Sequence, residues 1–102
     1  MARRSPTLFP AQRRQLAALG ERLRLARKRR RLSTVQMAER AHVSRDTFAR
    51  VEKGDPAVSF GIYLRVLRVL GLDADLDLIA GDDVLGRKLQ DMALDRAPGR
   101  KG

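Results

Sequence analysis

The sequence predicts a small all-α domain, and three observations favour that class. At 102 residues the chain has room for one modest core, and with aromatic residues at 4% that core must be built from Leu, Val, Ala and Ile. The absence of cysteine excludes a disulfide framework. Apolar residues recur at helical intervals, and several of these segments follow a serine that can serve as a helix N-cap. We expect a flexible basic arm at residues 1–10, a five-helix domain at 11–81 and a partly disordered C-terminal extension at 82–102.

The first helix is expected over residues 11–30, with one apolar stripe and arginine on its other faces. The stripe consists of Leu16, Leu19, Leu23 and Ala26. The helix ends in the basic run Arg27, Lys28, Arg29, Arg30 and Arg31. Cations suit a helix C-terminus, so this run is interpreted either as a solvated helix end or as a phosphate-binding cluster. Repulsion among five adjacent like charges favours the phosphate interpretation.

Residues 33–54 carry the same helix-start signature twice. Ser33 and Ser44 are predicted N-caps, each with an apolar residue before it and another four positions after it. Ser33 also forms a capping-box pattern with Gln36. Only residues 42–44 separate the two helices, which is too short for an antiparallel pair and predicts a helix-turn-helix. The expected contacts between these helices come from Met37, Ala38, Ala41, Val43, Phe48 and Val51.

The pattern of residues 54–102 predicts two or three further helices. Gly54 and Pro56 break the chain, Ser59 begins a fourth helix, and Gly71 ends it. Residues 74–80 fit either a short helix or, through their period-two alternation, a short dimerisation strand; we favour the helix. Leu85, Leu89 and Met92 share one face of a further helix.

The charge distribution points to a polyanion as the partner. Residues 1–53 hold 15 Lys and Arg against 4 Asp and Glu, whereas residues 54–102 hold 7 against 8. This asymmetry favours nucleic acid, and the basic helix lacks the aromatic apolar face of a helix that lies on a membrane. Single-stranded RNA recognition normally needs exposed aromatic side chains, which are scarce here. No apolar run is long enough to cross a bilayer, so the expected location is the cytoplasm.

An enzyme, a metal site and a cofactor are not expected. The chain has no cysteine and one histidine, His42, and its serines are used as helix caps. His42 is interpreted as a turn residue instead of a switch. The acidic residues Asp73, Asp75, Asp77, Asp82 and Asp83 do not have the spacing of a calcium-binding loop, and enrichment at a helix start accounts for them.

Residues 32–54, LSTVQMAERAHVSRDTFARVEKG, resemble the helix-turn-helix of the phage-repressor-like XRE family. Flanking segments extend the resemblance over about residues 19–72, and it implies a five-helix repressor-like fold. The style of the chain is most similar to HipB-type antitoxins, which implies a dimeric, autoregulating repressor that binds double-stranded operator DNA and a HipA-type kinase toxin. A phage-type or restriction-modification controller repressor is the alternative. Two positions depart from the family: Thr34 replaces a frequent Gln, and His42 replaces a frequent turn Gly.

A helix-turn-helix presents the start of its second helix to base edges in the major groove. The candidate base-contacting residues are Ser44, Arg45, Asp46, Thr47, Ala49 and Arg50. Arg45 is expected to contact guanine, while Asp46 either accepts from cytosine or, as we favour, stabilises the helix start and orients Arg45. The candidate phosphate contacts are Arg27, Lys28, Arg29, Arg30, Arg31, Thr34, Gln36 and Lys53, with Thr47 as a further hydroxyl.

Homodimerisation is expected because one module reads too little sequence for a specific operator. The candidate dimer or partner surface consists of Leu64, Val69, Leu72, Leu76, Ile79, Leu85, Leu89 and Met92. For the face formed by the last three, three interpretations stay open: packing on the same subunit, docking of a toxin, and dimer packing.

Overall fold

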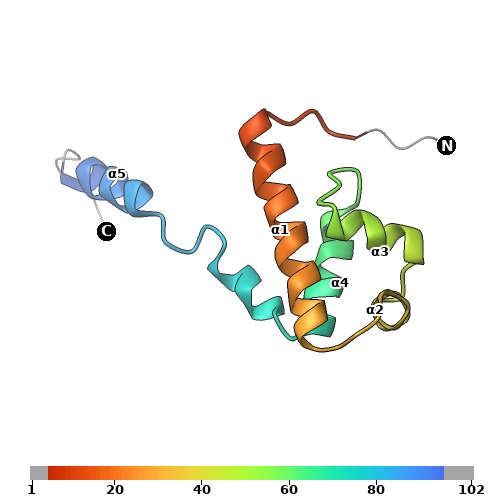
Figure 1. Cartoon of the computed structure of the whole chain (residues 1–102). Coiled ribbons are helices and arrows are strands. Elements are labelled where there is room, and N and C mark those ends of the chain that lie inside the picture. The colour runs from red at the N-terminus through yellow and green to blue at the C-terminus, as the bar shows by residue number, and fades with distance from the viewer. Residues whose placement is uncertain (1–4, 96–102) are drawn as a thin grey trace.

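The computed structural model describes residues 5–95 and is all-α over that range (Figure 1). The expected arm at 1–10 and tail at 82–102 lie partly outside the described residues. The elements are α1 (Pro10–Arg29), α2 (Thr34–Ala41), α3 (Arg45–Glu52), α4 (Phe60–Leu70), the 3-10 helix η1 (Asp73–Leu78) and α5 (Val84–Asp95). The all-α prediction is confirmed.

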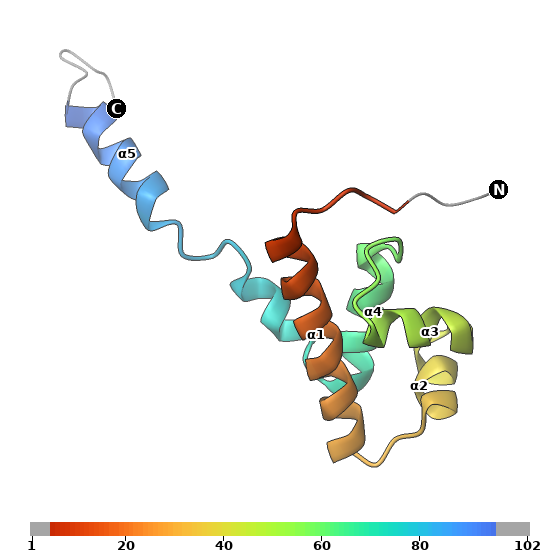
Figure 2. The same ribbon diagram turned by 45° about the horizontal axis from the view of Figure 1, so that its top comes forward.

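Helices α1 to α4 surround a single apolar core. Helix α2 packs on α3 and α4, and α1 packs on α3 and α4 from the other side (Figure 2). The largest fully buried side chains are Phe48, Met37, Val51 and Val66. Leu23 and Ala26 of α1 and Tyr63 and Leu70 of α4 are also buried in this core. The expected core of the two short helices is confirmed, except that Val43 is only half-buried.

The predicted helix starts are confirmed in atomic detail. The hydroxyl oxygens of Ser33, Ser44 and Ser59 each accept a hydrogen bond from the backbone N–H three residues later, at 3.0, 3.0 and 3.3 Å. The Gln36 carboxamide closes the capping box by accepting from Ser33 N at 2.8 Å. His42 takes the left-handed conformation at the turn (φ 57°), as expected of a residue in the place of glycine.

A close backbone approach joins α1 to the end of α3. Gly20 is buried in α1, and a Cβ at this position would lie 2.6 Å from the carbonyl oxygen of Glu52 and 2.7 Å from the nitrogen of Gly54. Gly54, at φ 69°, lies equally tightly against the backbone of Leu16 and Ala17. Two glycines therefore set the distance between α1 and α3.

The C-terminal elements differ from the expectations. Residues 73–78 form a 3-10 helix, so the alternative of a strand is wrong for this segment. Helix α5 forms as predicted but buries none of its residues and projects away from the other helices (Figures 1 and 2). The radius of gyration, 19.0 Å, well exceeds the value of about 13 Å for a compact chain of this length. Packing of the Leu85, Leu89 and Met92 face on the same subunit is therefore wrong, because these side chains are 67%, 56% and 49% exposed.

Candidate nucleic-acid interface

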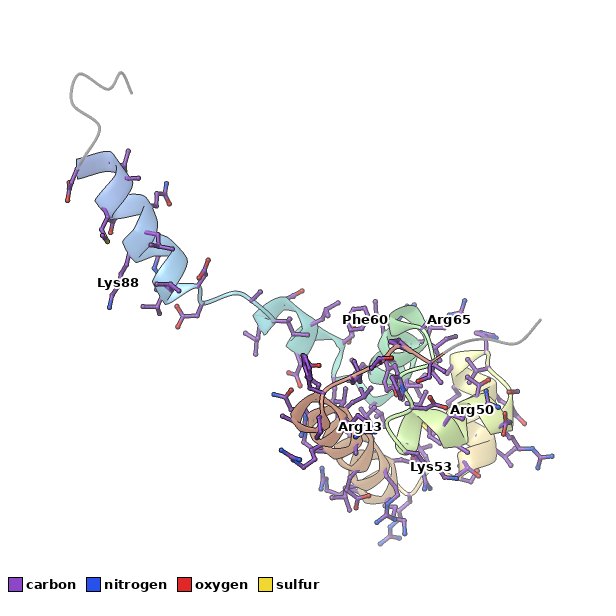
Figure 3. All side chains as sticks on the ribbon, turned by 90° about the horizontal axis from the view of Figure 1, so that it is seen from above. Arg13, Arg50, Lys53, Phe60, Arg65 and Lys88 are labelled. Atoms are coloured by element: carbon purple, nitrogen blue, oxygen red, sulfur yellow. The ribbon has the colours of Figure 1, made fainter. Side chains whose placement is uncertain are left out.

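Helix α3 has one buried side and one exposed side. Phe48 and Val51 are 0% exposed and fix the helix to the core. Asp46, Arg50 and Lys53 lie on the opposite side, and all three are exposed. Figure 3 labels Arg50 on this helix and Lys53 at its C-cap. The core therefore holds α3 so that its polar side faces away from the protein.

The start of α3 is organised by two hydroxyl groups. Ser44 caps the helix, and its hydroxyl also donates to Thr47 Oγ1 at 2.9 Å, while Thr47 is half-buried. Arg45, directly after the cap, is exposed and forms no ion pair within residues 5–95. Of the candidate base-contacting residues, Arg45 thus keeps all of its guanidinium donors unused, whereas the two hydroxyls are already engaged with each other.

Asp46 forms an ion pair with Arg50 instead of Arg45. Its Oδ2 lies 3.2 Å from Arg50 Nη2, one helical turn further on, and both side chains are largely exposed. The expectation that Asp46 orients Arg45 therefore differs from the structure. An exposed pair of this kind is weak, so Arg50 can exchange the carboxylate for a base or a phosphate at little cost.

The start of α2 carries two of the predicted phosphate contacts. Thr34 and Gln36 are both exposed. Because the Gln36 carbonyl oxygen accepts from Ser33 N, the side-chain NH2 group is the part that remains to donate. The capping box thus gives this amide a defined orientation beside the N-terminus of a helix, where anions are favoured.

The basic run at the end of α1 contains two arginines that are bonded within the protein and three cations that are not. Arg27 Nε donates to Glu52 Oε2 at 2.7 Å and Arg27 Nη1 to the carbonyl oxygen of Leu32 at 3.0 Å. The two charged side chains are only 12% and 10% exposed. Arg27 therefore ties α1 to α3, and we leave it out of the proposed phosphate contacts. Arg30 donates to the carbonyl oxygen of Ala26 at 2.9 Å and closes the helix end.

The other three cations of the run, Lys28, Arg29 and Arg31, are exposed. Arg31 has a left-handed backbone (φ 56°), which turns the chain from α1 towards α2. These three cations form neither an ion pair nor a side-chain hydrogen bond within the described residues, so they remain available at this corner of the molecule.

A shallow hollow lies beside the start of α3. It is lined by His42, Val43, Ser44, Thr47, Ala57, Ser59 and Ile62. The capped N-termini of α3 and α4 both border it, and helix N-termini favour anions. Sequence reasoning missed this hollow, since the residues that line it come from four separate segments: the turn, α3, the loop between α3 and α4, and the start of α4.

The loop between α3 and α4 is held in place by Tyr63. Its hydroxyl donates to the carbonyl oxygen of Asp55 at 2.9 Å, and the Asp55 carboxylate accepts from Ala57 N at 2.8 Å. Burial, with a contribution from the Asp55 carboxylate, raises the pKa of Tyr63 to about 12. The phenol is therefore neutral at ordinary pH and acts as a fixed donor beneath the loop.

The predicted dimer surface falls into two parts. Val69 and Leu72 are half-buried against the core, and Leu64 and Leu76 line a shallow depression between α4 and η1. Ile79 is 65% exposed beyond η1. Helix α5 lies apart from α4 in Figure 2.

A family model described as a helix-turn-helix domain matches residues 18–78, which is more than half of the chain. The match covers all of α2, α3, α4 and η1 and most of α1. No curated protein matches the chain. Within residues 5–95 no helix is long and apolar enough to span a membrane. The chain therefore belongs to the helix-turn-helix domain family and is a DNA-binding protein.

Proposed function

We propose that the protein is a sequence-specific transcriptional repressor that binds a double-stranded operator as a homodimer. One observation carries the proposal: α3 buries Phe48 and Val51 completely while exposing Arg45, Arg50 and Lys53 on the side that faces away from the core. A helix that is fixed to the core on one side and exposes basic side chains on the other can enter the major groove of DNA and contact base edges.

The contacts divide into base and phosphate contacts. Arg45 is the proposed guanine reader, since its planar fork of donors matches O6 and N7. Arg50 and Ala49 lie further along the same side of α3, with Asp46 holding Arg50 until DNA replaces it. The proposed phosphate contacts are Lys28, Arg29, Arg31, Thr34, Gln36 and Lys53, which position the helix without reading sequence.

The test is a binding titration of the purified protein with the DNA upstream of its own gene, at several salt concentrations. For Arg45→Ala we expect lost discrimination at one base pair, equivalent to roughly 1–3 kcal/mol, with a nearly unchanged salt slope. For Lys53→Ala we expect weaker binding to all sequences and a slope shallower by about 1.8, because the homodimer loses two phosphate contacts. Lys88→Ala, on α5, is the matched control and should leave both quantities unchanged. No preference for any duplex over random competitor would overturn the proposal.

The antitoxin role is a second, finer proposal, supported by the similarity of the sequence to HipB-type antitoxins. It adds a HipA-type kinase toxin as partner to the same DNA chemistry. A kinase-like reading frame beside this gene, and inhibition of that kinase by this protein, would support it. Operator binding with no such neighbour would favour the phage-type or restriction-modification controller alternative.

A further inference from the structure

Two apolar surfaces of the chain face solvent. The first is the α5 face, defined here as Leu85, Leu89 and Met92. The second is a groove of about 550 Å³ between α1, the start of α4 and η1, which we name the α1–α4 groove. Its apolar lining includes Leu8, Leu16, Leu19, Phe60, Leu67, Leu76 and Ile79. Figure 3 labels Phe60, which is 62% exposed, on α4.

Helix α5 lacks the means to be stable alone. It has twelve residues, contains Gly86 in its first turn and buries no side chain. Isolated helices shorter than about 12–15 residues are marginal in water even with favourable sequences. An Asp83 carboxylate that accepts from Gly86 N at 2.8 Å caps its start, but a cap contributes only about 1 kcal/mol. A helix at this position therefore requires a partner for its apolar face.

The charges of the two surfaces are complementary. Helix α1, which forms one wall of the groove, carries seven Lys and Arg against one acidic residue, Glu21. The segment that would cross to a second copy, residues 79–95, carries four aspartates against two cations and has a net charge of −2. Arg22 of α1 and Asp75 of η1 both line the groove. The charge complementarity is therefore between the net negative segment 79–95 and the net positive helix α1.

The linker carries α5 away from the groove of its own subunit. Residues 79–83 connect η1 to α5, Ala80 has a left-handed backbone (φ 59°), and the long axis of the molecule reaches 62 Å because α5 projects outward. A short linker that presents a helix to the outside is the geometry of an exchanged arm. In a dimer with two-fold symmetry, the α5 helix of each copy would then lie in the groove of the other copy.

We infer that α5 of each protomer binds in the α1–α4 groove of a second copy, so that the protein is a homodimer held by reciprocal helix exchange. In a reciprocal exchange each helix–groove contact occurs twice, so the buried surface area is doubled. This doubling brings the area buried by a twelve-residue helix closer to the total of about 1,600 Å² that is typical of a stable interface. The inference deepens the dimer part of the proposed function. It can be tested without DNA, so its failure is distinguishable from a failure of operator binding.

The first test measures the mass of the full chain by light scattering between about 1 and 100 µM. We expect a dimer for the wild type, and for Leu89→Asp a dimer weakened on the order of 100-fold or more, because the new carboxylate would have to enter an apolar groove. Gln90→Asp adds the same charge on the other side of α5 and should remain dimeric. A monomeric wild type, or a Leu89→Asp protein that dimerises normally, would overturn the inference. At concentrations low enough for all the proteins to be monomeric, both variants should keep the thermal transition of the remaining helices, because α5 buries no side chain within its own chain.

The second test uses the absence of cysteine from the chain. Three single variants, Leu85→Cys, Leu89→Cys and Met92→Cys, are each mixed with a longer, tagged Phe60→Cys chain and then oxidised. We expect at least one of them to form the mixed disulfide dimer, and Gln90→Cys to form much less. If instead a chain with both Phe60→Cys and Leu89→Cys closes an internal disulfide as a monomer, α5 folds back onto its own groove and the exchange is refuted.

Discussion

Helices α3 and α5 are both short and amphipathic, yet only α3 has its apolar side covered by the rest of the chain. In α3 the apolar side is completely covered, so Phe48 and Val51 are 0% exposed and the charged side faces outward. In α5 the apolar side is bare, with Leu89 56% exposed. The side of a helix that the rest of its chain covers thus decides the kind of partner that it can bind. For α3 the partner is a polyanion, whereas for α5 it is another apolar surface.

The sharpest test of this comparison truncates one large side chain in each helix. Phe48→Ala should destabilise the protein by roughly 3–5 kcal/mol, because it leaves a cavity in the core. Leu89→Ala should cost less than about 0.5 kcal/mol when the chain is monomeric, because this side chain then touches little. Urea unfolding followed by circular dichroism at low protein concentration measures both values. Equal losses would break the comparison.

The second largest effect concerns the ion pair that joins α1 to α3. Arg27→Met should cost about 2–3 kcal/mol, somewhat less than a fully buried pair, because it leaves the Glu52 carboxylate largely buried without its cation. The double variant with Glu52→Leu should recover most of that loss. Arg87→Met breaks the exposed pair with Asp82 on the α5 side and should cost less than about 1 kcal/mol. If the double variant is as unstable as Arg27→Met, packing and not charge explains the loss.

A pair of glycine substitutions sharpens the comparison further. Gly20→Ala should destabilise by about 1–3 kcal/mol, since the new Cβ would meet the backbone of residues 51–54 at less than 3 Å. Gly61→Ala, in α4, meets only Ser59 Oγ at 4.0 Å and should stabilise by about 0.5–1 kcal/mol through the higher helix propensity of alanine. Melting temperatures that move in opposite directions are the expected result. The same sign at both positions would contradict the close approach of α1 and α3.

The last effect is absent at neutral pH and appears only in alkaline solution. The pKa of Tyr63 is raised to about 12, so the folded state holds the phenol proton more tightly than the unfolded chain. The resulting stabilisation is complete well below pH 10 and is lost as the pH rises from 10 towards 12, with about 1 kcal/mol lost near pH 10.5. Tyr63 is the single tyrosine of the chain, so its phenolate absorbance reports the titration directly. Tyr63→Phe should not show this component of the loss.

The local elements of the fold could be predicted because their causes lie within a few residues of one another. Ser33, Ser44 and Ser59 accept from an N–H only three positions away, so the three helix starts were readable from the sequence. His42 at the turn followed from the short spacing between two caps. The buried side of α3 followed from helical periodicity.

The features that were missed depend on residues far apart in the chain. Arg27 and Glu52 are 25 positions apart, and nothing local distinguishes Arg27 from the cations that follow it. Gly20 lies on the same stripe as Leu16 and Leu23, and a glycine on a buried helical face was a usable signal for a close approach. The predicted face of α5 was correct in its composition, but periodicity does not tell whether a face meets its own chain or another.

The exposed side of α3 also bears on how such a protein changes over evolutionary time. Asp46, Ala49, Arg50 and Lys53 bury no apolar surface in the core, so replacing them leaves the free energy of folding nearly unchanged. Folding and target choice are thereby encoded by separate residues of α3 and of its C-cap, Lys53. Mutations at these positions can therefore change the DNA sequence that is bound, one position at a time, with little effect on the stability of the fold.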